Sequence, residues 1–386
     1  MIKELVISLY LLLFKTLFAF FSVCPLKNKT VFLSSFGDNA YFLAEELRHF
    51  NPHPMVFLNQ KRCKANFSAL ELKNKKIYPF ETFNIKDTLL SAYHLATSKY
   101  VFIDNYVGAL SVVRFRKNVK CVQLWHAAGA VKKFGWSDPE TNKRNERAKS
   151  RFQKVYDQFH YIPVGSQQMA DIFAESFQLS PDHFLFTGVP QTDFYFNADA
   201  KTRGLSQVMQ RYPMIKGKKT VLYAPTFRKD MLHKMDLHLN IEEMLKKLGE
   251  EYILLIRLHP AVQESSKLPD NPRVLPVSDY PHIHELLLAS DFLITDYSSL
   301  PVEFSLLRKK MIFYTYDSES YSQTHGLWTE DPSYFPGPIA KTTAEVIEHI
   351  LDPGIDYETI DRFSHRWNTF STGNSCRRLI EAIYDN

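Results

Sequence analysis

One stretch in the second half of the sequence combines hydroxyl and carboxylate residues in the pattern of an anion-binding turn. Residues 290–317 read as a buried apolar strand, a turn that contains Asp296, Ser298 and Ser299, a helix, and a second apolar strand. Such a turn places two hydroxyls and unpaired N–H groups at the positive end of a helix, which suits a phosphate or another oxyanion. The same serines are equally typical of a helix cap, with Asp296 as a turn former, and the turn alone leaves both interpretations open.

Two further strand ends in this half carry groups that bind phosphate. The run YAPTFR contains Thr226 and Arg228, and the run RLHP contains Arg257 and His259. Arginine binds phosphate oxygens in a bidentate geometry, and a protonated histidine stabilises charge or protonates a leaving group. Either run alone would also fit an ordinary surface strand end. Three such ends in one sheet predict an anion site beside a nucleotide pocket.

The first half of the sequence contains a candidate general base. His126 directly follows an apolar strand in WHAAG, and Gly129 and Lys132 come shortly after it. Histidine has the right unperturbed pKa to take a proton from a hydroxyl near neutral pH. A histidine at a strand end is more often structural, but the order of strand, His, Gly and Lys-Lys favours a base, with Gly129 and Lys132 contacting the substrate.

Composition and missing motifs exclude several classes of protein. The chain has 386 residues and is 45% hydrophobic, which excludes a largely disordered protein. It lacks a GxxxxGK loop, a GxGxxG fingerprint and a GxSxG elbow, so ATP hydrolysis, classical dinucleotide binding and serine hydrolysis are not indicated. Its four cysteines are scattered without metal-ligand spacing, so we predict no metal and no cofactor, and a reducing cytosol fits them. No nucleic-acid-binding pattern is present.

The N-terminal stretch Leu5–Val23 is the most apolar part of the chain. It leaves three interpretations open, in this order of preference: a helix in the membrane interface, a single span, or a buried core helix. Lys15 would lie near the middle of a span at substantial cost. As a helix, the stretch has a narrow polar stripe, which fits an interfacial position. Lys and Arg also cluster between Arg114 and Lys154. This cluster favours anionic partners, such as a phosphorylated substrate or an anionic membrane surface, but a solvated helix face, the commoner outcome for a run of charges, stays open.

Strands followed by polar turns and helices recur along the chain, which predicts an α/β protein with parallel sheets. The apolar pattern lapses between residues 198 and 219, and a second alternating series follows. We therefore expect a membrane-associating helix over 1–28, Rossmann-type domains over 29–200 and 201–362, and a terminal helix over 363–386 that returns to the first domain. Two such domains would place the active site in the cleft between them.

Taken together, the motifs resemble the CDP-glycerol glycerophosphotransferase family of teichoic-acid synthesis. The resemblance rests on WHAAGAVKKFG, YAPTFR, RLHP and ITDYSSLPVEF, and on FIDNY, TGVPQTD and FSHRWNTFSTGNS elsewhere in the chain. It runs through nearly the whole chain and is nearest to the short members that act as glycerol-phosphate primases. It implies a GT-B-like fold, attached peripherally to the cytoplasmic face of a Gram-positive cell membrane.

The resemblance also implies substrates and residue roles. The donor would be CDP-glycerol, and the acceptor an undecaprenyl-diphosphate-linked disaccharide that ends in N-acetylmannosamine, with CMP released. By similarity, His126 matches the catalytic base. The resemblance assigns His259 and Asp296 to catalysis, with Asp296 either orienting His259 or holding the turn. The residues expected at the donor diphosphate are Arg228, Arg257, Thr226, Ser298 and Ser299.

One departure from the family's pattern concerns the donor. His325 precedes Gly326 where the family usually has Arg before Gly, which implies a weaker or rearranged donor contact. The sequence also leaves alternative functions open. These are a later-acting glycerol- or ribitol-phosphate transferase, a UDP-sugar enzyme of GT-B fold, and a catalytically silent membrane scaffold.

Overall fold

The computed structural model describes residues 2–50, 53–82, 84–226, 237–258, 268–319, 321, 326–329, 331 and 334–384. Three residues named above, Arg228, His259 and His325, lie outside these ranges. The chain divides into two compact units. Unit 1 comprises residues 1–127, 134–193 and 370–386, and unit 2 comprises residues 128–133 and 194–369.

The core of unit 1 is a parallel sheet of five strands in the order β3-β2-β1-β4-β5. The strands are β1 (Lys27–Ser34), β2 (Met55–Asn59), β3 (Lys75–Pro79), β4 (Ser98–Ile103) and β5 (Lys120–Gln123). All pair in parallel. The strand order reverses between β1 and β4, so the loops that follow these two strands diverge to opposite faces of the sheet. Ligands of open α/β sheets bind at such a point.

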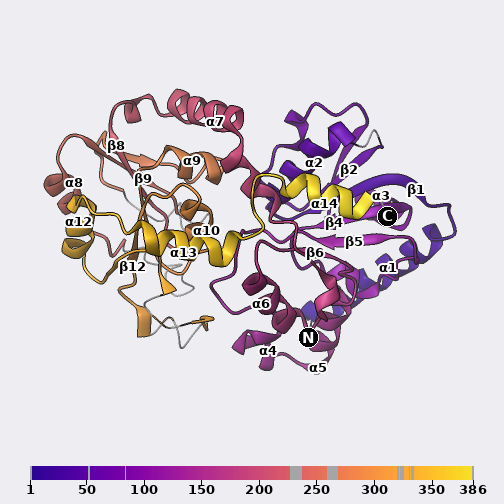
Figure 1. Ribbon diagram of the computed structural model, residues 1–386. Helices are drawn as coiled ribbons and strands as arrows, with labels where there is room; N and C mark the ends of the chain where they lie inside the picture. The colour runs from indigo at the N-terminus through magenta and orange to yellow at the C-terminus, as the bar shows by residue number, and fades with distance from the viewer. Residues whose placement is uncertain are drawn as a thin grey trace. The chain divides into compact units, whose positions relative to one another are not determined.

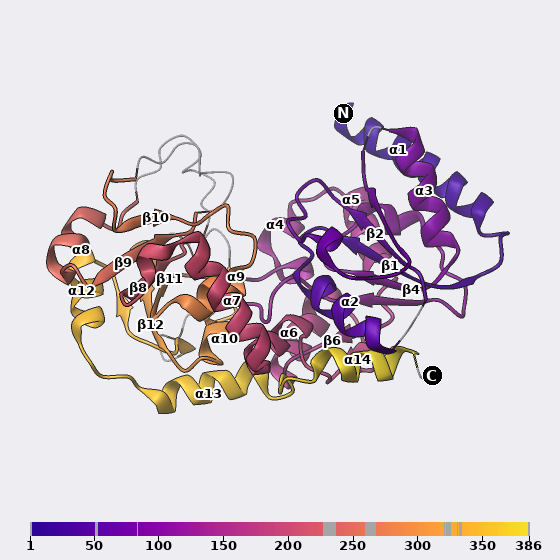
Figure 2. The same ribbon diagram turned by 90° about the horizontal axis from the view of Figure 1, so that it is seen from above.

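Helices cover both faces of this sheet (Figure 2). Helices α2 (Asp38–Phe50) and α14 (Ser375–Tyr384) pack together on one face, where they bury a cluster with Phe32, Phe57 and Phe102 of the strands. Helices α1 (Ile2–Phe21) and α3 (Ile85–Ala96) pack together on the other. Unit 1 also contains α4 (Pro139–Asn142), α5 (Glu146–Tyr156), β6 (Ile162–Pro163), α6 (Gln167–Phe177) and β7 (Phe184–Leu185).

Helix α1 has one packed face and one exposed apolar face. Leu11, Phe14 and Phe18 are buried against the unit, whereas Leu9 and Leu12 are about 60% exposed, at 58% and 61%. By length and composition alone, the segment Glu4–Phe21 could cross a membrane. Only 17% of this segment is buried in the protein. The interpretation of this stretch as a buried core helix is therefore wrong.

Unit 2 contains a parallel sheet of six strands in the order β10-β9-β8-β11-β12-β13. The strands are β8 (Lys219–Tyr223), β9 (Tyr252–Ile256), β10 (Val274–Pro276), β11 (Phe292–Thr295), β12 (Lys310–Tyr314) and β13 (Ile339–Ala340). The order reverses between β8 and β11, as it does between β1 and β4 in unit 1. The central strands are apolar along their whole length because both faces of the sheet are covered.

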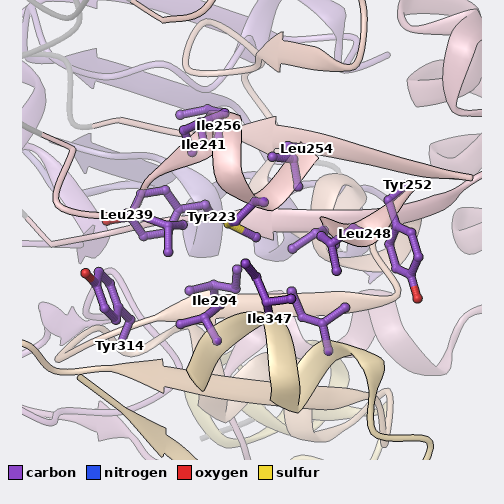
Figure 3. Packing of buried hydrophobic residues seen from close by; sticks show 14 of the residues in the cluster. Tyr223, Leu239, Ile241, Leu248, Tyr252, Leu254, Ile256, Ile294, Tyr314 and Ile347 are labelled. Atoms are coloured by element: carbon purple, nitrogen blue, oxygen red, sulfur yellow. The ribbon is translucent and has the colours of Figure 1, made fainter. Parts of the chain in front are cut away.

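The two faces of this sheet carry different helices. Helices α8 (Ile241–Leu248) and α12 (Thr343–Leu351) cover one face, and Figure 3 shows Ile241, Leu248 and Ile347 meeting strand side chains there. The other face is covered by α7 (Ala198–Arg211), α9 (Ile283–Ala289), α10 (Leu300–Ser305) and α13 (Tyr357–Asn368) (Figure 1). Local signals fix the helix starts: Thr342 and Glu345 form a reciprocal capping box at α12.

The structure differs from the sequence prediction at two places. Helix α7 occupies part of the segment that was expected to be a linker, because its Val208 is buried in the core of unit 2. The helical pattern expected from Phe363 to Tyr384 is two helices, α13 and α14, and Gly373 in the connection has a φ of +90°. Helix α13 belongs to unit 2 and α14 to unit 1.

Candidate active site

In unit 1, a buried carboxylate organises the loop after β1. Asp104 directly follows β4 and is 1% exposed. Its carboxylate accepts hydrogen bonds from the backbone N–H groups of Ser35, Phe36 and Gly37 at 2.7, 3.0 and 2.7 Å. Burial raises the pKa of Asp104 to about 6, although these three N–H donors favour its charged form. The carboxylate therefore fixes the turn at the carboxyl edge of the sheet.

Glycine is required in this turn. Gly37 has a φ of +102°, and a Cβ there would lie 2.4 Å from the Cβ of Ala65. Any other residue would strain the backbone and clash with its neighbour. The turn can therefore present its N–H groups to Asp104 only with glycine at this position.

The candidate base, His126, lies beside the same turn. Its ring stacks on Phe36, with 4.5 Å between ring centroids, and its Nδ1 is 3.2 Å from the backbone oxygen of Asp104. If Nδ1–H donates to this carbonyl, Nε2 carries the lone pair that accepts a proton. Burial lowers the pKa of His126 to about 4, so the ring is neutral at pH 7. A neutral ring in this tautomer has the form that a general base needs.

The residue before His126 holds a strained backbone conformation. Trp125 has a φ of +60°, which costs a non-glycine residue on the order of 1–3 kcal/mol. Two side chains stabilise it: the oxygen of Gln123 accepts from the Trp125 N–H at 2.9 Å, and the amide of Asn39 donates to the Trp125 carbonyl at 3.1 Å. Asn39 is fully buried. The chain therefore turns sharply at the end of β5, and this turn sets the position of His126.

In unit 2, Asp296 occupies a place that corresponds to Asp104. It directly follows β11, is 2% exposed, and accepts hydrogen bonds from Thr226 in the loop after β8. The Thr226 N–H lies 2.9 Å and its hydroxyl 3.0 Å from the carboxylate oxygens. Thr226 and Asp296 are therefore brought together, as the sequence analysis expected of strand ends in one sheet.

The serine turn after Asp296 leads into helix α10. The Ser298 hydroxyl oxygen accepts the N–H of Leu300 at 3.1 Å and lies 3.1 Å from the Thr295 hydroxyl. Ser299 is the N-cap residue, and its side chain makes no capping hydrogen bond. Glu303 in the same helix is buried and accepts a hydrogen bond from the Tyr195 hydroxyl at 3.1 Å. Ser298 thus holds the turn, and both serines are only partly buried.

Lys132 lies near this turn through a stack of two tyrosines. Its Nζ is 5.4 Å from the ring centroid of Tyr321, which stacks on Tyr297 at 4.0 Å. The backbone oxygen of Lys132 accepts from the Trp328 indole N–H at 3.0 Å. Lys132 therefore belongs to unit 2, beside the residue that precedes Ser298.

Gly129 has a packing reason for being glycine. A Cβ there would lie 2.8 Å from Val302 Cγ2 and 3.0 Å from Trp367 Cε3. The expected role of this glycine, close passage of the chain by a ligand, is not needed to explain it.

Arg257 supports a loop at the carboxyl edge of unit 2. One guanidinium nitrogen donates to the backbone oxygens of Tyr280 at 2.8 Å and Val277 at 3.3 Å, in the segment that follows β10. The side chain is partly exposed. The contacts at the ends of β8 and β11 and the tyrosine stack thus bring five predicted site residues together in the described part of unit 2: Thr226, Asp296, Ser298, Ser299 and Lys132. Arg257 lies at the end of the neighbouring strand, β9.

Sequence reasoning missed Asp104 as a site residue. The signal was present, because FID in unit 1 repeats the pattern of ITD in unit 2, with an aspartate directly after an apolar strand. Within the described ranges, no group of three or more His, Cys, Asp or Glu side chains is placed to hold a metal ion.

The fold and these side chains define a class: GT-B-like α/β proteins, with two Rossmann-type units that each carry polar groups at the carboxyl ends of a parallel sheet. The predicted fold class is confirmed by solved structures. The wall teichoic acid polymerase TagF, in its H444N variant soaked with CDPG, matches with a TM-score of 0.81 at 19% identity, covering 100% of this chain and 98% of that one. UDP-GlcNAc 2-epimerase from Neisseria meningitidis matches with a TM-score of 0.58 at 14% identity, covering 93% and 100%.

The sequence comparison identifies the family. The pattern of the CDP-Glycerol:Poly(glycerophosphate) glycerophosphotransferase family matches residues 16–385, and the chain belongs to this family. It is 36% identical over 384 residues to a teichoic acid glycerol-phosphate primase of Bacillus subtilis strain 168, covering 99% of this chain and 98% of the relative. It is 34% identical over 300 residues to a teichoic acid ribitol-phosphate primase of Bacillus spizizenii W23, covering 76% of each. The resemblance inferred from the motifs is confirmed.

Proposed function

We propose that this enzyme transfers glycerol phosphate from CDP-glycerol to the N-acetylmannosamine of an undecaprenyl-diphosphate-linked disaccharide, releasing CMP. This reaction primes wall teichoic acid synthesis. The observation that carries the proposal is the 36% identity to the Bacillus subtilis glycerol-phosphate primase, which extends over 99% of this chain and 98% of the relative. A match over both whole lengths favours a shared reaction rather than a shared domain.

The proposed chemistry is an in-line displacement at the phosphorus that bears glycerol. The sugar hydroxyl oxygen forms the new bond to phosphorus, the bond from phosphorus to the CMP oxygen breaks, and CMP leaves as the anion. Nε2 of His126 takes the hydroxyl proton. The neutral ring and the Nδ1 contact with the Asp104 carbonyl support this role.

Unit 2 would stabilise the charge on the donor diphosphate. Ser298, Ser299 and Lys132 supply hydroxyls and a cation, and preorganised donors of this kind are worth most where charge develops. Asp296 would hold Thr226 in place through the two hydrogen bonds that Thr226 donates. Arg228, Arg257 and His259 keep the roles that the resemblance implies. That these groups and His126 meet around the same substrates stays a prediction.

The enzyme would work on the cytoplasmic face of the membrane, attached by α1. The exposed apolar face of this helix includes Leu5, Leu9 and Leu12, each about 60% exposed, at 61%, 58% and 61%. Residues of this kind bury into the interface between head groups and acyl chains. Attachment would keep the enzyme near an acceptor that never leaves the bilayer.

A donor and acceptor screen tests the proposal. Purified enzyme is given CDP-glycerol, CDP-ribitol or a UDP-sugar, with the lipid-linked disaccharide either bare or already carrying one glycerol phosphate. We expect CMP release and product only with CDP-glycerol and the bare disaccharide. Transfer only to the extended acceptor would identify a later-acting transferase. Preference for CDP-ribitol is the second candidate, since the ribitol-phosphate primase is 34% identical. Release of UDP would identify a UDP-sugar enzyme.

A further inference from the structure

A cavity of about 980 Å³ lies in unit 1 between α1, the start of α3 and α5. Its apolar lining comes from α1, including Val6, Leu9 and Leu13, and from Ile85 and Ala109. The volume is at the upper end of the range for ligand sites, which are mostly apolar with a few polar groups. Helices α1 and α3 lie together at one side of the sheet in Figure 2. The cavity is therefore formed entirely by residues of unit 1.

An ion pair holds the wall of the cavity. The Arg151 guanidinium on α5 binds the Glu4 carboxylate on α1 through two nitrogens, at 2.9 and 3.1 Å. Both residues line the cavity, so the pair sets the distance between its two helices. Arg144 and Lys143, which also pairs with Glu140 at 2.6 Å, add basic groups to the lining beside the apolar surface. An occupant that has both a hydrocarbon chain and an anionic head would complement this lining.

Two connections join the cavity to the candidate base. Tyr106 lines the cavity and lies two residues after Asp104, whose backbone oxygen contacts His126. On another side, Glu81 in the lining accepts a hydrogen bond from the Gln60 amide at 2.5 Å, and the oxygen of Gln60 accepts the Ser35 hydroxyl at 2.6 Å. Ser35 begins the turn that Asp104 holds. The cavity thus adjoins the acceptor half of the chemistry.

The position of the cavity also selects its occupant. Leu9 belongs both to the cavity lining and to the exposed apolar face of α1, so hydrocarbon can pass from a bilayer into the cavity without crossing water. A chain that enters there and ends in an anion near Tyr106 would bring its head group toward His126. Bulk phospholipid would gain nothing from this connection.

We propose that this cavity binds the prenyl chain of the lipid-linked acceptor, with Lys143 and Arg144 beside its diphosphate. The inference rests on the proposed function, because it names the part of the acceptor that unit 1 recognises. It assigns acceptor selection to chain length as well as to the sugar.

The test fills the cavity without touching the candidate site. Ala148 lines the cavity from α5, so Ala148→Leu adds volume there with a good helix former. Ser150→Leu, an exposed position on the same helix outside the lining, is the matched control. With the full prenyl acceptor, we expect Ala148→Leu to raise KM at least tenfold and Ser150→Leu to leave it unchanged. With an acceptor that carries a short alkyl chain, and for the KM of CDP-glycerol, both variants should match the parent.

Binding measurements separate the inference from the proposed function. A prenyl diphosphate with a photoreactive group near its chain end should label residues 106–109 or 144–151 in the parent and in Ser150→Leu, and not in Ala148→Leu. This result would support the cavity even if no glycerol phosphate were transferred. Labelling elsewhere, or equal KM values for Ala148→Leu and the parent, overturns the inference. Loss of binding to anionic phospholipid vesicles in Ala148→Leu alone would assign the cavity to bilayer lipid instead.

Discussion

The carboxylate of Asp296 accepts hydrogen bonds from both the backbone N–H and the hydroxyl of Thr226, at 2.9 and 3.0 Å. These bonds join the loop after β8 to the loop after β11, at the point where the strand order of unit 2 reverses. The sequence left open whether Asp296 orients His259 or holds its turn. The contacts show that Asp296 holds the Thr226 loop, while the orienting of His259, which lies outside the described residues, stays a prediction.

Unit 1 uses the same arrangement. Asp104 follows β4 and binds three N–H groups of the loop after β1, again across the reversal of strand order. In both units, the loop after the first strand is therefore held by an aspartate at the end of a strand that comes later in the chain. The two aspartates preorganise the edges of the sheets where ligands of this fold class bind.

The first prediction separates positioning from proton transfer at Asp296. In Asp296→Asn, one carboxylate oxygen becomes an NH₂ group, which cannot accept from Thr226. We expect kcat/KM for CDP-glycerol to fall on the order of tenfold to a hundredfold, because the Thr226 loop shifts. The pH profile should keep its shape. A change in the limbs of the profile would instead show that Asp296 carries a proton during turnover.

The chain offers a matched control for this variant. Asp291 immediately precedes β11, and its carboxylate accepts hydrogen bonds from the N–H and hydroxyl of Thr220 in β8 at 2.8 and 3.1 Å. Its bonds copy those of Asp296 at the opposite end of β8 and β11. Because Asp291 is exposed, Asp291→Asn should lower stability less than Asp296→Asn and leave kcat/KM near that of the parent. Equal losses of activity in both variants would point to general destabilisation.

The second prediction concerns Asp104. Asp104→Ala leaves the N–H groups of Ser35, Phe36 and Gly37 without their acceptor. Each unsatisfied buried donor costs roughly 1–3 kcal/mol, partly offset because a buried carboxylate is also removed. We expect a loss of about 2–4 kcal/mol in the free energy of unfolding, measured by urea denaturation, with Asp104→Asn in between. An unchanged midpoint would contradict the assignment of Asp104 as the anchor of this turn.

The third prediction is the pH dependence of the base. The pKa of His126 is lowered to about 4 by burial, so the ring stays neutral, and able to accept a proton, well below its usual range. The acid limb of kcat/KM, which reports the free enzyme, should therefore lie near pH 4 to 5 rather than near 6.5. His126→Gln should lower kcat on the order of 10²- to 10⁴-fold and remove this limb.

His160 provides the control for that variant. It is another partly buried histidine of unit 1, its pKa is also lowered by burial, and its Nδ1 accepts the Cys121 N–H at 3.0 Å. His160→Gln should affect thermal stability at most and leave kcat and the pH profile intact. If His126→Gln proves equally harmless in a folded protein, another group takes the hydroxyl proton.

The sequence was sufficient to predict a strand where the segment itself has a clear apolar pattern. The strands β8, β9 and β11 are continuous apolar runs that end in polar residues, so both their type and the edge they share were predictable. Strand β3 was not identified, because the run KKIYP has charged residues and an exposed Ile77, at 40%, as edge strands often do. Position in the sheet, rather than composition, makes it a strand.

The site was less predictable where a residue depends on distant partners. The donors to Asp104 come from 67 to 69 residues earlier in the chain, so the FID pattern alone could not reveal its role. Gly129 stays a predicted ligand-contacting glycine, and its close packing against Val302 and Trp367, far along the chain, could not be predicted from the sequence. Such roles follow from tertiary packing, which no local pattern encodes.

The last prediction uses a buried lysine far from the candidate site. Lys29 in β1 is 5% exposed, and its Nζ contacts the His94 ring at 3.0 Å and the Thr97 hydroxyl at 2.7 Å. Burial lowers the pKa of Lys29 to about 7. Since the unfolded chain holds this proton up to about pH 10.4 and the folded protein releases it near pH 7, stability should rise with pH between these values.

Lys29→Met has no proton to release, so its stability relative to the parent should fall steadily from pH 7 to pH 10 in urea unfolding. Lys27→Met, at an exposed position of the same strand, should show no such trend. A difference between Lys29→Met and the parent that stays constant with pH would mean that Lys29 remains charged in the folded protein.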